Sequence, residues 1–474
     1  MAYDDSLAYL PAWQLRDLIV GGELTPLRVT EYFLDRIQRL DPFYHAFITV
    51  EPDYALQQAR LAEQKLADGG PYGSLFGVPI SIKDQLLTKG LRTTAGSLVY
   101  KSYVPEEDSL YAERARSAGA IILGKTNTPE FAMSARTNNL LLPECLNPWD
   151  RQRTSGGSSG GAAVSVVTGM CPLAIATDGG GSIRMPSAFC GAFGLHPSNG
   201  RVPRHGNLGG TLFLTGIGPI ASNVRDAAIL LQMLAAPDPR DPGCVKQPAP
   251  DYLDTLERGV EGVTVGWFSE CFAAAGMQPE VLEVARAAAL RFAELGAKVE
   301  EADIRFDPKA LRPAFRVLSE TDKYALLGHY YENPETRDLL TEMVRYRFEL
   351  GRSLTAADYS RALSTRFRLI GEFEGIFKKY DLLMSPATGL IAPHIEDLST
   401  SVVREVLSAY AYVANFSGCT AASVPCGTVN GLPVGLQIIG PPNGESLVFR
   451  ASRAFERLQP WAERHPELPV ASAA

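Results

Sequence analysis

Two glycine- and serine-rich stretches and one lysine have the residue types and the spacing for acyl transfer. The stretches are TSGGSSGG (154–161) and TDGGGSIR (177–184). Because glycine lacks a Cβ and tolerates positive φ, the main chain of the second stretch can aim several N–H donors at one bound atom. An oxyanion hole needs this arrangement. We therefore predict that the Ser182 hydroxyl attacks a carbonyl carbon whose oxygen is held by nearby amides. The expected donors are the amides of Gly179, Gly180, Gly181 and Ser182.

A serine nucleophile needs a base, and two residue types are candidates. The six histidines are dispersed, and His196 precedes Pro197 on what reads as a departing turn. Lys83 is the last residue of an apolar segment that we expect to be a strand. A lysine in such a position more often extends to the surface, with its aliphatic chain packed on apolar neighbours. If Lys83 is buried, its pKa falls from about 10.4 towards neutrality at about 1.4 kcal/mol per unit, and the amine can take a proton. We predict a relay from Ser182 through a second hydroxyl to Lys83.

Other interpretations of the glycine-rich stretches are weaker. Composition alone allows residues 154–161 to be a flexible linker, but a small-residue helix follows, so their amides would lie at its N-terminus. A phosphate-binding loop would need G-x-x-x-x-G-K-[ST] or G-x-G-x-x-G, and neither occurs in the right context. Residues 156–160 fit G-x-S-x-G, the elbow of Ser-His-Asp hydrolases. A nucleophile elbow must follow a buried strand, but the segment before this match is the polar NPWDRQRT. The match is therefore not expected to be an elbow.

The surrounding pattern predicts elements that could position these residues. FGVPISIKDQL (76–86), AIILGKTN (120–127) and CPLAIATD (171–178) read as buried strands, with helical patterns between them. We predict an α/β fold: a single large domain, 1–474, with a central mixed, mostly parallel twisted sheet covered by helices on both faces. Within it we expect N-terminal helices over 1–65, core motifs over 76–200, a variable pocket-shaping region over 201–380 and the end of the core over 381–457.

Composition excludes several classes of protein. The 474 residues carry a net charge of −8 with a pI near 5.5, which does not suggest nucleic-acid or membrane partners. The first residues lack the features of a signal peptide, so we expect a cytoplasmic protein. Seven scattered cysteines without a C-x-x-C pair argue against disulfides or zinc. We expect neither a metal nor another cofactor.

Several segments together resemble the amidase signature family of Ser-cisSer-Lys hydrolases. They are GVPISIKDQLLTKGLRTTAGS, GKTNTPEFAM, NPWD, GGSSGG, TDGGGSIRMPSAFCGAFGLHPSNGRV and GLPVGLQIIGPP, and the likeness runs from about Leu7 to Arg457. It implies that Lys83 is the catalytic lysine, Ser158 the bridging serine after a cis bond from Gly157, and Ser182 the acylated nucleophile. The spacings of 75 and 24 residues agree with the family pattern. Ser159, Asp178 and Arg184 are implied as a supporting polar network.

The resemblance also implies an activity: hydrolysis of a carbon-nitrogen bond of a small or aryl amide through an acyl-enzyme, with carbamates (a urethanase activity) and esters as further substrates. Met133 and Gly179 are expected to line the acyl side, and the apolar loop LLLPEC (140–145) favours a bulky substrate. His196 and Ser198 replace the lysine and threonine common in the family, and Gly179 replaces a larger residue. A monomer or a homodimer is expected. The alternatives are an amidotransferase-type subunit that releases ammonia from glutamine for a partner, and a Ser-His-Asp esterase.

Overall fold

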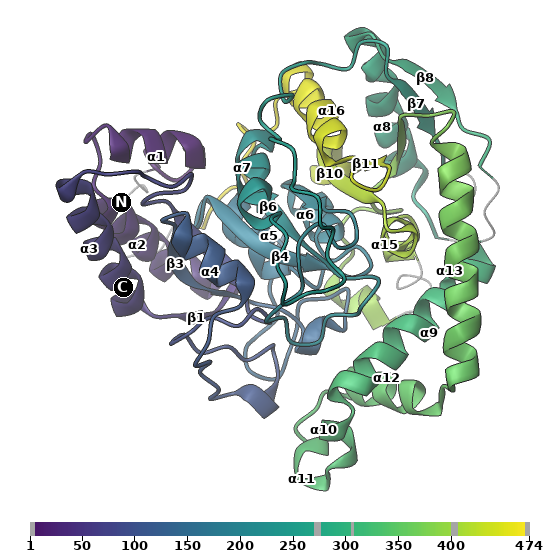
Figure 1. The fold of residues 1–474 in the computed structure, drawn as a ribbon, viewed down its shortest axis with the longest axis horizontal. Coiled ribbons are helices and arrows are strands. Elements are labelled where there is room, and N and C mark those ends of the chain that lie inside the picture. Colours follow the sequence, from purple (N-terminus) through teal and green to yellow (C-terminus); the bar gives the residue numbers. More distant parts are fainter. Residues whose placement is uncertain (1–4, 270–275, 305–307, 400–405, 470–474) are drawn as a thin grey trace.

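The centre of the molecule is one mixed β-sheet of eleven strands (Figure 1). The structure is a computed structural model and describes residues 5–269, 276–304, 308–399 and 406–469. The strand order is β1-β3-β2-β4-β6-β5-β10-β11-β9-β7-β8. The strands are β1 (Phe47–Val50), β2 (Pro79–Lys83), β3 (Ile121–Thr126), β4 (Leu173–Asp178), β5 (Phe193–His196), β6 (Gly216–Ala221), β7 (Thr264–Trp267), β8 (Lys298–Glu301), β9 (Leu382–Pro386), β10 (Thr420–Val429) and β11 (Leu432–Gly440).

The predicted mixed sheet flanked by helices is confirmed, but the predicted majority of parallel pairs is wrong. Among the described strands, six of the ten pairings are antiparallel. One reason is the β10–β11 hairpin, whose turn residues Asn430 and Gly431 have φ of 51° and 78°. An Asn-Gly pair favours such a two-residue turn because both positions need positive φ. The other reason is β6, which runs antiparallel between β4 and β5.

Helices pack on the sheet along its whole length. The helices of this group are α1 (Ala12–Val20), α2 (Pro26–Tyr44), α3 (Pro52–Asp68), α4 (Leu110–Ser117), α5 (Gly160–Val167), α6 (Arg184–Cys190), α7 (Val224–Leu234), α8 (Pro279–Leu290), α15 (Tyr412–Ser417) and α16 (Glu445–Leu458). The predicted start of α2 is confirmed: Thr25 accepts a hydrogen bond from the Arg28 amide, and Pro26 is the first helical residue. No helix in the described ranges combines the length and the apolar character that a membrane span requires.

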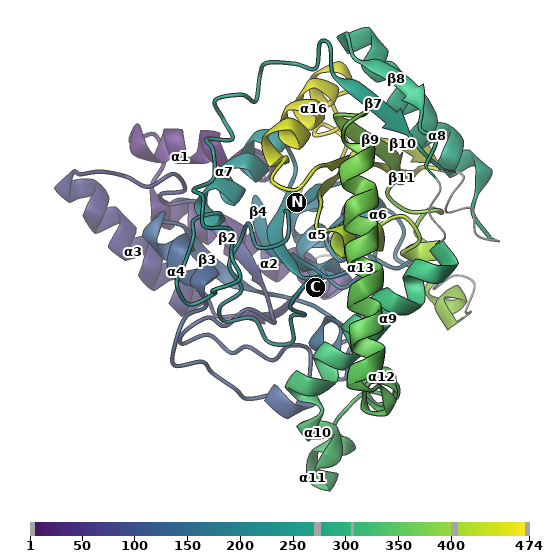
Figure 2. The same cartoon turned by 45° about the vertical axis from the view of Figure 1, so that its right-hand side comes forward.

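A second group of helices lies to one side of the sheet and extends to the lower end of Figures 1 and 2. It consists of α9 (Pro308–Leu327), α10 (His329–Glu332), α11 (Pro334–Arg337), α12 (Glu342–Ser353) and α13 (Ala356–Ile376). α9 packs against both α12 and α13, and α13 reaches α15 beside the sheet. These helices lie within the region predicted to shape the pocket; the finer boundaries predicted inside the domain stay predictions.

Two neighbouring strands place the reactive residues together. β2 and β4 are parallel and adjacent, so both strands end at the same edge of the sheet. Lys83 is the last residue of β2, and the glycines 179–181 follow the last residue of β4. Helix α5 begins just after the serine-rich loop, and α6 begins just after Ser182. All four segments therefore meet at one place.

Candidate active site

Lys83 is fully buried among three hydroxyl groups. Its Nζ lies 2.7 Å from Ser158 Oγ, 2.8 Å from Ser159 Oγ and 2.9 Å from Thr177 Oγ1. Burial lowers the pKa of Lys83 well below its ordinary value; the carboxylate of Asp178 opposes this effect, and the charge of Lys323 adds to it. The neutral amine is therefore favoured, as predicted for a buried lysine.

The hydrogen bonds around Lys83 determine which hydroxyl can give it a proton. Ser159 Oγ donates to the Thr177 carbonyl at 3.1 Å, and Thr177 Oγ1 donates to Gln85 Oε1 at 3.2 Å. Both of these hydroxyls can still accept an N–H from the lysine. A neutral amine has two N–H donors and one lone pair. Within the described structure, Ser158 Oγ has no acceptor of its own other than Lys83 Nζ, so its proton can point at that lone pair.

The peptide bond between Gly157 and Ser158 is cis, as predicted. Ser158 is buried, and the amide of the next residue, Ser159, donates to the Ser182 carbonyl at 3.2 Å. The serine-rich loop is thus joined directly to the glycine loop. Ser158 and Ser182 line one cavity. No hydrogen bond joins their hydroxyls in the described part of the chain, and catalytic hydrogen bonds are often long before substrate binds.

The glycine loop offers three free amides rather than the four predicted. The Gly181 N–H already donates to Asp178 Oδ1 at 2.6 Å, so it is not available to an oxyanion. The N–H groups of Gly179, Gly180 and Ser182 donate to no partner within the described ranges, and these residues border the cavity. Gly181 has a φ of 113°, and a Cβ on it would lie 2.5 Å from the Cβ of Ala411. Glycine is therefore required at 181 for shape, not as a donor.

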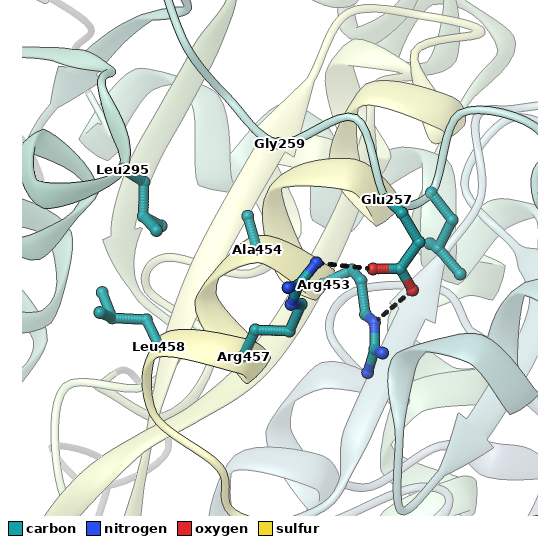
Figure 3. A pocket seen from close by; sticks show the side chains of 8 residues that line it. Glu257, Gly259, Leu295, Arg453, Ala454, Arg457 and Leu458 are labelled. Atoms are coloured by element: carbon teal, nitrogen blue, oxygen red, sulfur yellow. Dashed lines mark hydrogen bonds and ion pairs between the residues drawn. The ribbon is translucent and has the colours of Figure 1, made fainter.

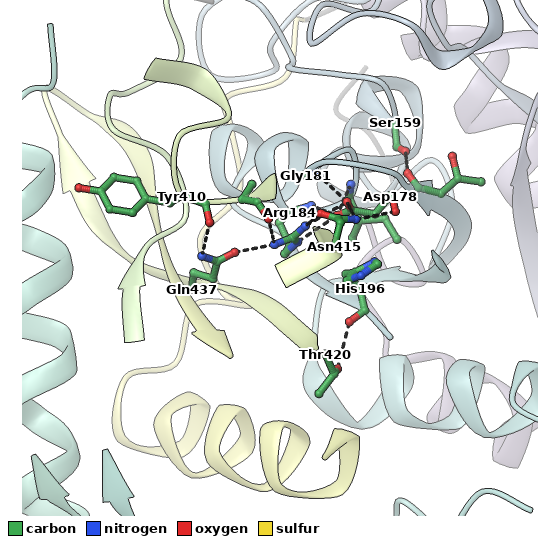
Figure 4. A network of polar contacts seen from close by, with 12 residues as sticks. Ser159, Asp178, Gly181, Arg184, His196, Tyr410, Asn415, Thr420 and Gln437 are labelled. Atoms are coloured by element: carbon green, nitrogen blue, oxygen red, sulfur yellow. Dashed lines mark hydrogen bonds and ion pairs between the residues drawn. The ribbon is translucent and has the colours of Figure 1, made fainter. Parts of the chain in front are cut away.

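A buried ion pair between Asp178 and Arg184 contacts the glycine loop (Figure 4). Arg184 Nε and Nη2 each donate to the Asp178 carboxylate at 3.0 Å, and neither residue is exposed. Arg184 also donates to Asn415, Gln437 and the Ala411 carbonyl. Burial alone would raise the pKa of Asp178, but the charge of Arg184, the nearby His196 and the hydrogen bonds from Arg184 and Asn415 together outweigh it and hold the pKa well below its usual value. Asp178 therefore joins the Gly181 amide to Arg184, and the supporting role of this pair stays a prediction.

No histidine is among the described residues that line the cavity. His196 is buried beside this ion pair, and burial lowers its pKa to about 4. Its ring nitrogens have no hydrogen-bond partner in the described structure. A conventional Ser-His-Asp arrangement would need an imidazole on the nucleophile. None of the described histidines lines the cavity that holds Ser182.

The cavity has a volume of about 160 Å³ and contains the predicted lining residues Met133 and Gly179. It also contains residues that the sequence did not single out. They are Gln85, Ala132, Ser134, Ala135, Thr177, Met185, Gly209, Thr211, Thr215, Phe315, Ser319, Lys323, Arg347 and Ser408. Phe315, Ser319 and Lys323 follow one another at intervals of four residues, and this spacing is typical of one face of a helix. Only the fold shows that this face meets the glycine loop.

A larger surface pocket of about 330 Å³ lies elsewhere, between α16 and residues 256–259 (Figure 3). Its two arginines, Arg453 and Arg457, are both paired with Glu257. None of the predicted catalytic residues lines it. This pocket is separate from the cavity that holds Ser158 and Ser182.

Known proteins of similar sequence and structure belong to one family. A sequence model of the Amidase family matches residues 28–449. The chain belongs to the amidase signature family. This amidase signature protein is 36% identical to a glutamyl-tRNA(Gln) amidotransferase subunit of Moorella thermoacetica, over 98% of this chain and 100% of the relative.

Solved structures of the family superimpose closely on it. A bacterial aryl acylamidase matches with a TM-score of 0.89 and 29% identity, over 97% of this chain and 98% of that one. The corresponding glutamyl-tRNA(Gln) amidotransferase subunit of Thermotoga maritima matches with a TM-score of 0.81 and 30% identity, over 94% and 95% of the two chains. The predicted family is confirmed, and its members of similar sequence include both amidases and amidotransferase subunits.

Proposed function

We propose that this protein hydrolyses the carbon-nitrogen bond of an amide through an acyl-enzyme on Ser182. The observation that carries the proposal is the set of contacts around Lys83: its buried amine lies within hydrogen-bond distance of three hydroxyls, and only that of Ser158 donates to no other acceptor among the described residues. A lysine at the surface could not remain neutral in this way. Membership of the amidase family supports the same chemistry.

The proposed reaction starts when Lys83 takes the proton of Ser158 as Ser158 takes that of Ser182. The Ser182 oxygen then attacks the carbonyl carbon. The free amides of Gly179, Gly180 and Ser182 donate to the oxygen as it becomes negative. The proton returns through Ser158 to the departing nitrogen, which leaves as an amine or ammonia. Water, deprotonated by the same relay, hydrolyses the ester on Ser182 and restores the three side chains.

The cavity indicates a small acyl group. Pockets that bury drug-sized ligands measure about 300–1,000 Å³, and this one measures about 160 Å³. This volume does not support a bulky acyl group, so the bulk of the substrate expected from the sequence would lie on the amine side. If the substrate carries an aryl group, we propose that it belongs to the amine part of the amide and lies outside the cavity. Small carbamates and esters react by the same steps, so they are included as substrates.

A second function is release of ammonia from glutamine for a partner protein. The relatives named as glutamyl-tRNA(Gln) amidotransferase subunits favour it, with identities of 36% for the examples from Moorella thermoacetica and Cyanothece sp.. In both cases we propose a cytoplasmic location. The two functions differ in one measurable respect: a free-standing amidase turns over simple amides as the isolated chain.

The test measures ammonia release and p-nitroaniline release from small amides and anilides by the purified chain. Ser182→Ala and Lys83→Met are expected to abolish turnover, and Ser158→Ala to reduce it by about 10²–10⁴-fold, the range for a proton-transfer group. Ser452→Ala is the matched control, because Ser452 is also buried and bonds only within its own helix, at Val448. Turnover that survives in Ser182→Ala contradicts the proposal.

A further inference from the structure

One face of α9 forms part of the wall of the cavity that holds the reactive serines. Phe315, Ser319 and Lys323 follow one another at intervals of four residues, and all three border the cavity. A Cβ on Gly180 would lie 2.9 Å from Phe315 Cζ, so this face touches the glycine loop. Side chains on a helix lean towards its N-terminus, which directs Lys323 back along α9 towards Phe315 and that loop.

Lys323 is a buried cation without a partner. Its exposed fraction is 8%, and its ammonium nitrogen makes no hydrogen bond or ion pair with any described residue. Buried polar groups normally have a partner, and a buried charge without one is costly. An unpartnered lysine at a cavity wall is therefore suited to pair with a ligand.

The other cation at the cavity wall is already neutralised. Arg347 donates to both oxygens of Glu320, at 2.6 Å from Nη2 and 2.8 Å from Nε. It also donates to the Met133 carbonyl at 2.8 Å and to Ser319 Oγ at 3.2 Å. All of its terminal nitrogens are thus engaged. Lys323 remains as the charge that a substrate would meet.

The cavity wall carries no compensating negative charge. Among its described lining residues there is no aspartate or glutamate. Burial and the charge of the nearby Arg347 together lower the pKa of Lys323 to about 7, although the charge of Glu320 opposes them. A bound anion would favour the ammonium form of this lysine, because an opposite charge at close range stabilises it.

We infer that Lys323 binds a carboxylate carried by the acyl part of the substrate, so that the preferred substrates are monoamides of short dicarboxylic acids. This inference rests on the proposed amide hydrolysis and adds the substrate class. Neutral amides of the same length leave Lys323 unpaired. Glutamine supplies the carboxylate, but its α-ammonium group finds no acidic partner in the described wall.

The test compares three pairs of substrates with the purified chain: succinamate with butyramide, glutaramate with valeramide, and adipamate with hexanamide. The wild type is expected to show a kcat/KM on the order of 10–100-fold higher for the anion of the best pair, which is the range of a charge-assisted hydrogen bond. It is also expected to prefer glutaramate to glutamine. The readout is the anion-to-neutral ratio, which does not depend on the fraction of protein that is active.

Lys323→Met is expected to reduce that ratio to near one, whereas Lys298→Met, a substitution of an exposed lysine on β8, leaves it at the wild-type value. Binding is measured separately by calorimetry on Ser182→Ala: glutaramate is expected to bind more tightly than valeramide, and the addition of Lys323→Met to remove the difference.

Three results would overturn the inference without contradicting amide hydrolysis. They are an equal kcat/KM for anionic and neutral amides, an anion-to-neutral ratio that Lys323→Met does not change, and a preference for glutamine over glutaramate. If no amide is hydrolysed, the proposed function fails instead. In that case the calorimetry still decides the inference, because it needs no turnover.

Discussion

Substitution of Gly181 by alanine tests the geometry of the glycine loop. Its φ of 113° lies where side chains are rarely found, at a cost of about 1–3 kcal/mol. The added Cβ would also lie 2.5 Å from the Ala411 Cβ, which is far inside the usual contact distance of about 3.5–4.0 Å. Overpacking of this kind costs about 1–3 kcal/mol, so the free energy of unfolding should fall by roughly 2–6 kcal/mol.

The same substitution should reduce turnover, because the loop must shift and the amides of its neighbours Gly180 and Ser182 move with it. Loss of one oxyanion donor costs about 2.7–4 kcal/mol, or about 10²–10³-fold in kcat. The assay combines urea unfolding with kcat on the best amide substrate. Gly371→Ala is the control: a Cβ there meets no atom within 4 Å, and alanine should stabilise helix α13 by about 0.5–1 kcal/mol. A wild-type kcat in folded Gly181→Ala would refute the role given to the loop.

Three further predictions concern charge. Because burial lowers the pKa of Lys83 and the reaction needs its neutral amine, kcat/KM should rise with pH and level off well below 10.5; a rise that continues to pH 10.5 contradicts this. Asp178→Asn should destabilise the protein by about 3–5 kcal/mol in urea unfolding at pH 7, since it leaves the buried Arg184 without a negatively charged partner. Folding lowers the pKa of Asp178, so its ionised carboxylate stabilises the folded protein fully above about pH 3.8. The difference in unfolding free energy between the wild type and Asp178→Asn should therefore shrink below that pH. Lys323→Met should be more stable at pH 7 by at most about 5 kcal/mol, because folding lowers this lysine's pKa from 10.5 to about 7; the gain should disappear as pH rises to 10.5.

The sequence was enough to predict Ser158 and Ser159 beside Lys83, because short local motifs carry these residues, whereas Thr177, the third hydroxyl at Lys83, was not predicted. Lys83 ends a strand, Ser158 lies in one glycine-rich loop and Ser182 in another. The parallel pairing of β2 and β4 explains why these distant segments meet, and a strand-helix-strand pattern predicts such pairing.

Other features depended on contacts that a single sequence does not reveal. The engagement of the Gly181 amide follows from the position of the Asp178 carboxylate after folding. The antiparallel majority of the sheet was missed, although the Asn430-Gly431 pair between two apolar runs is a hairpin signal. The role of α9 in the cavity needed the packing of α9 on the glycine loop, which its helical pattern alone cannot predict.

The identity of the acylated residue tests the account most directly. The enzyme is mixed with an activated ester of a short acid and quenched within one turnover, and its peptides are mapped by mass spectrometry. We predict one acyl group, on Ser182, and none in Ser182→Ala, whereas Lys83→Met acylates much more slowly at the same residue. An acyl group on Ser158 or Ser159, or unchanged acylation in the absence of Lys83, would contradict the account.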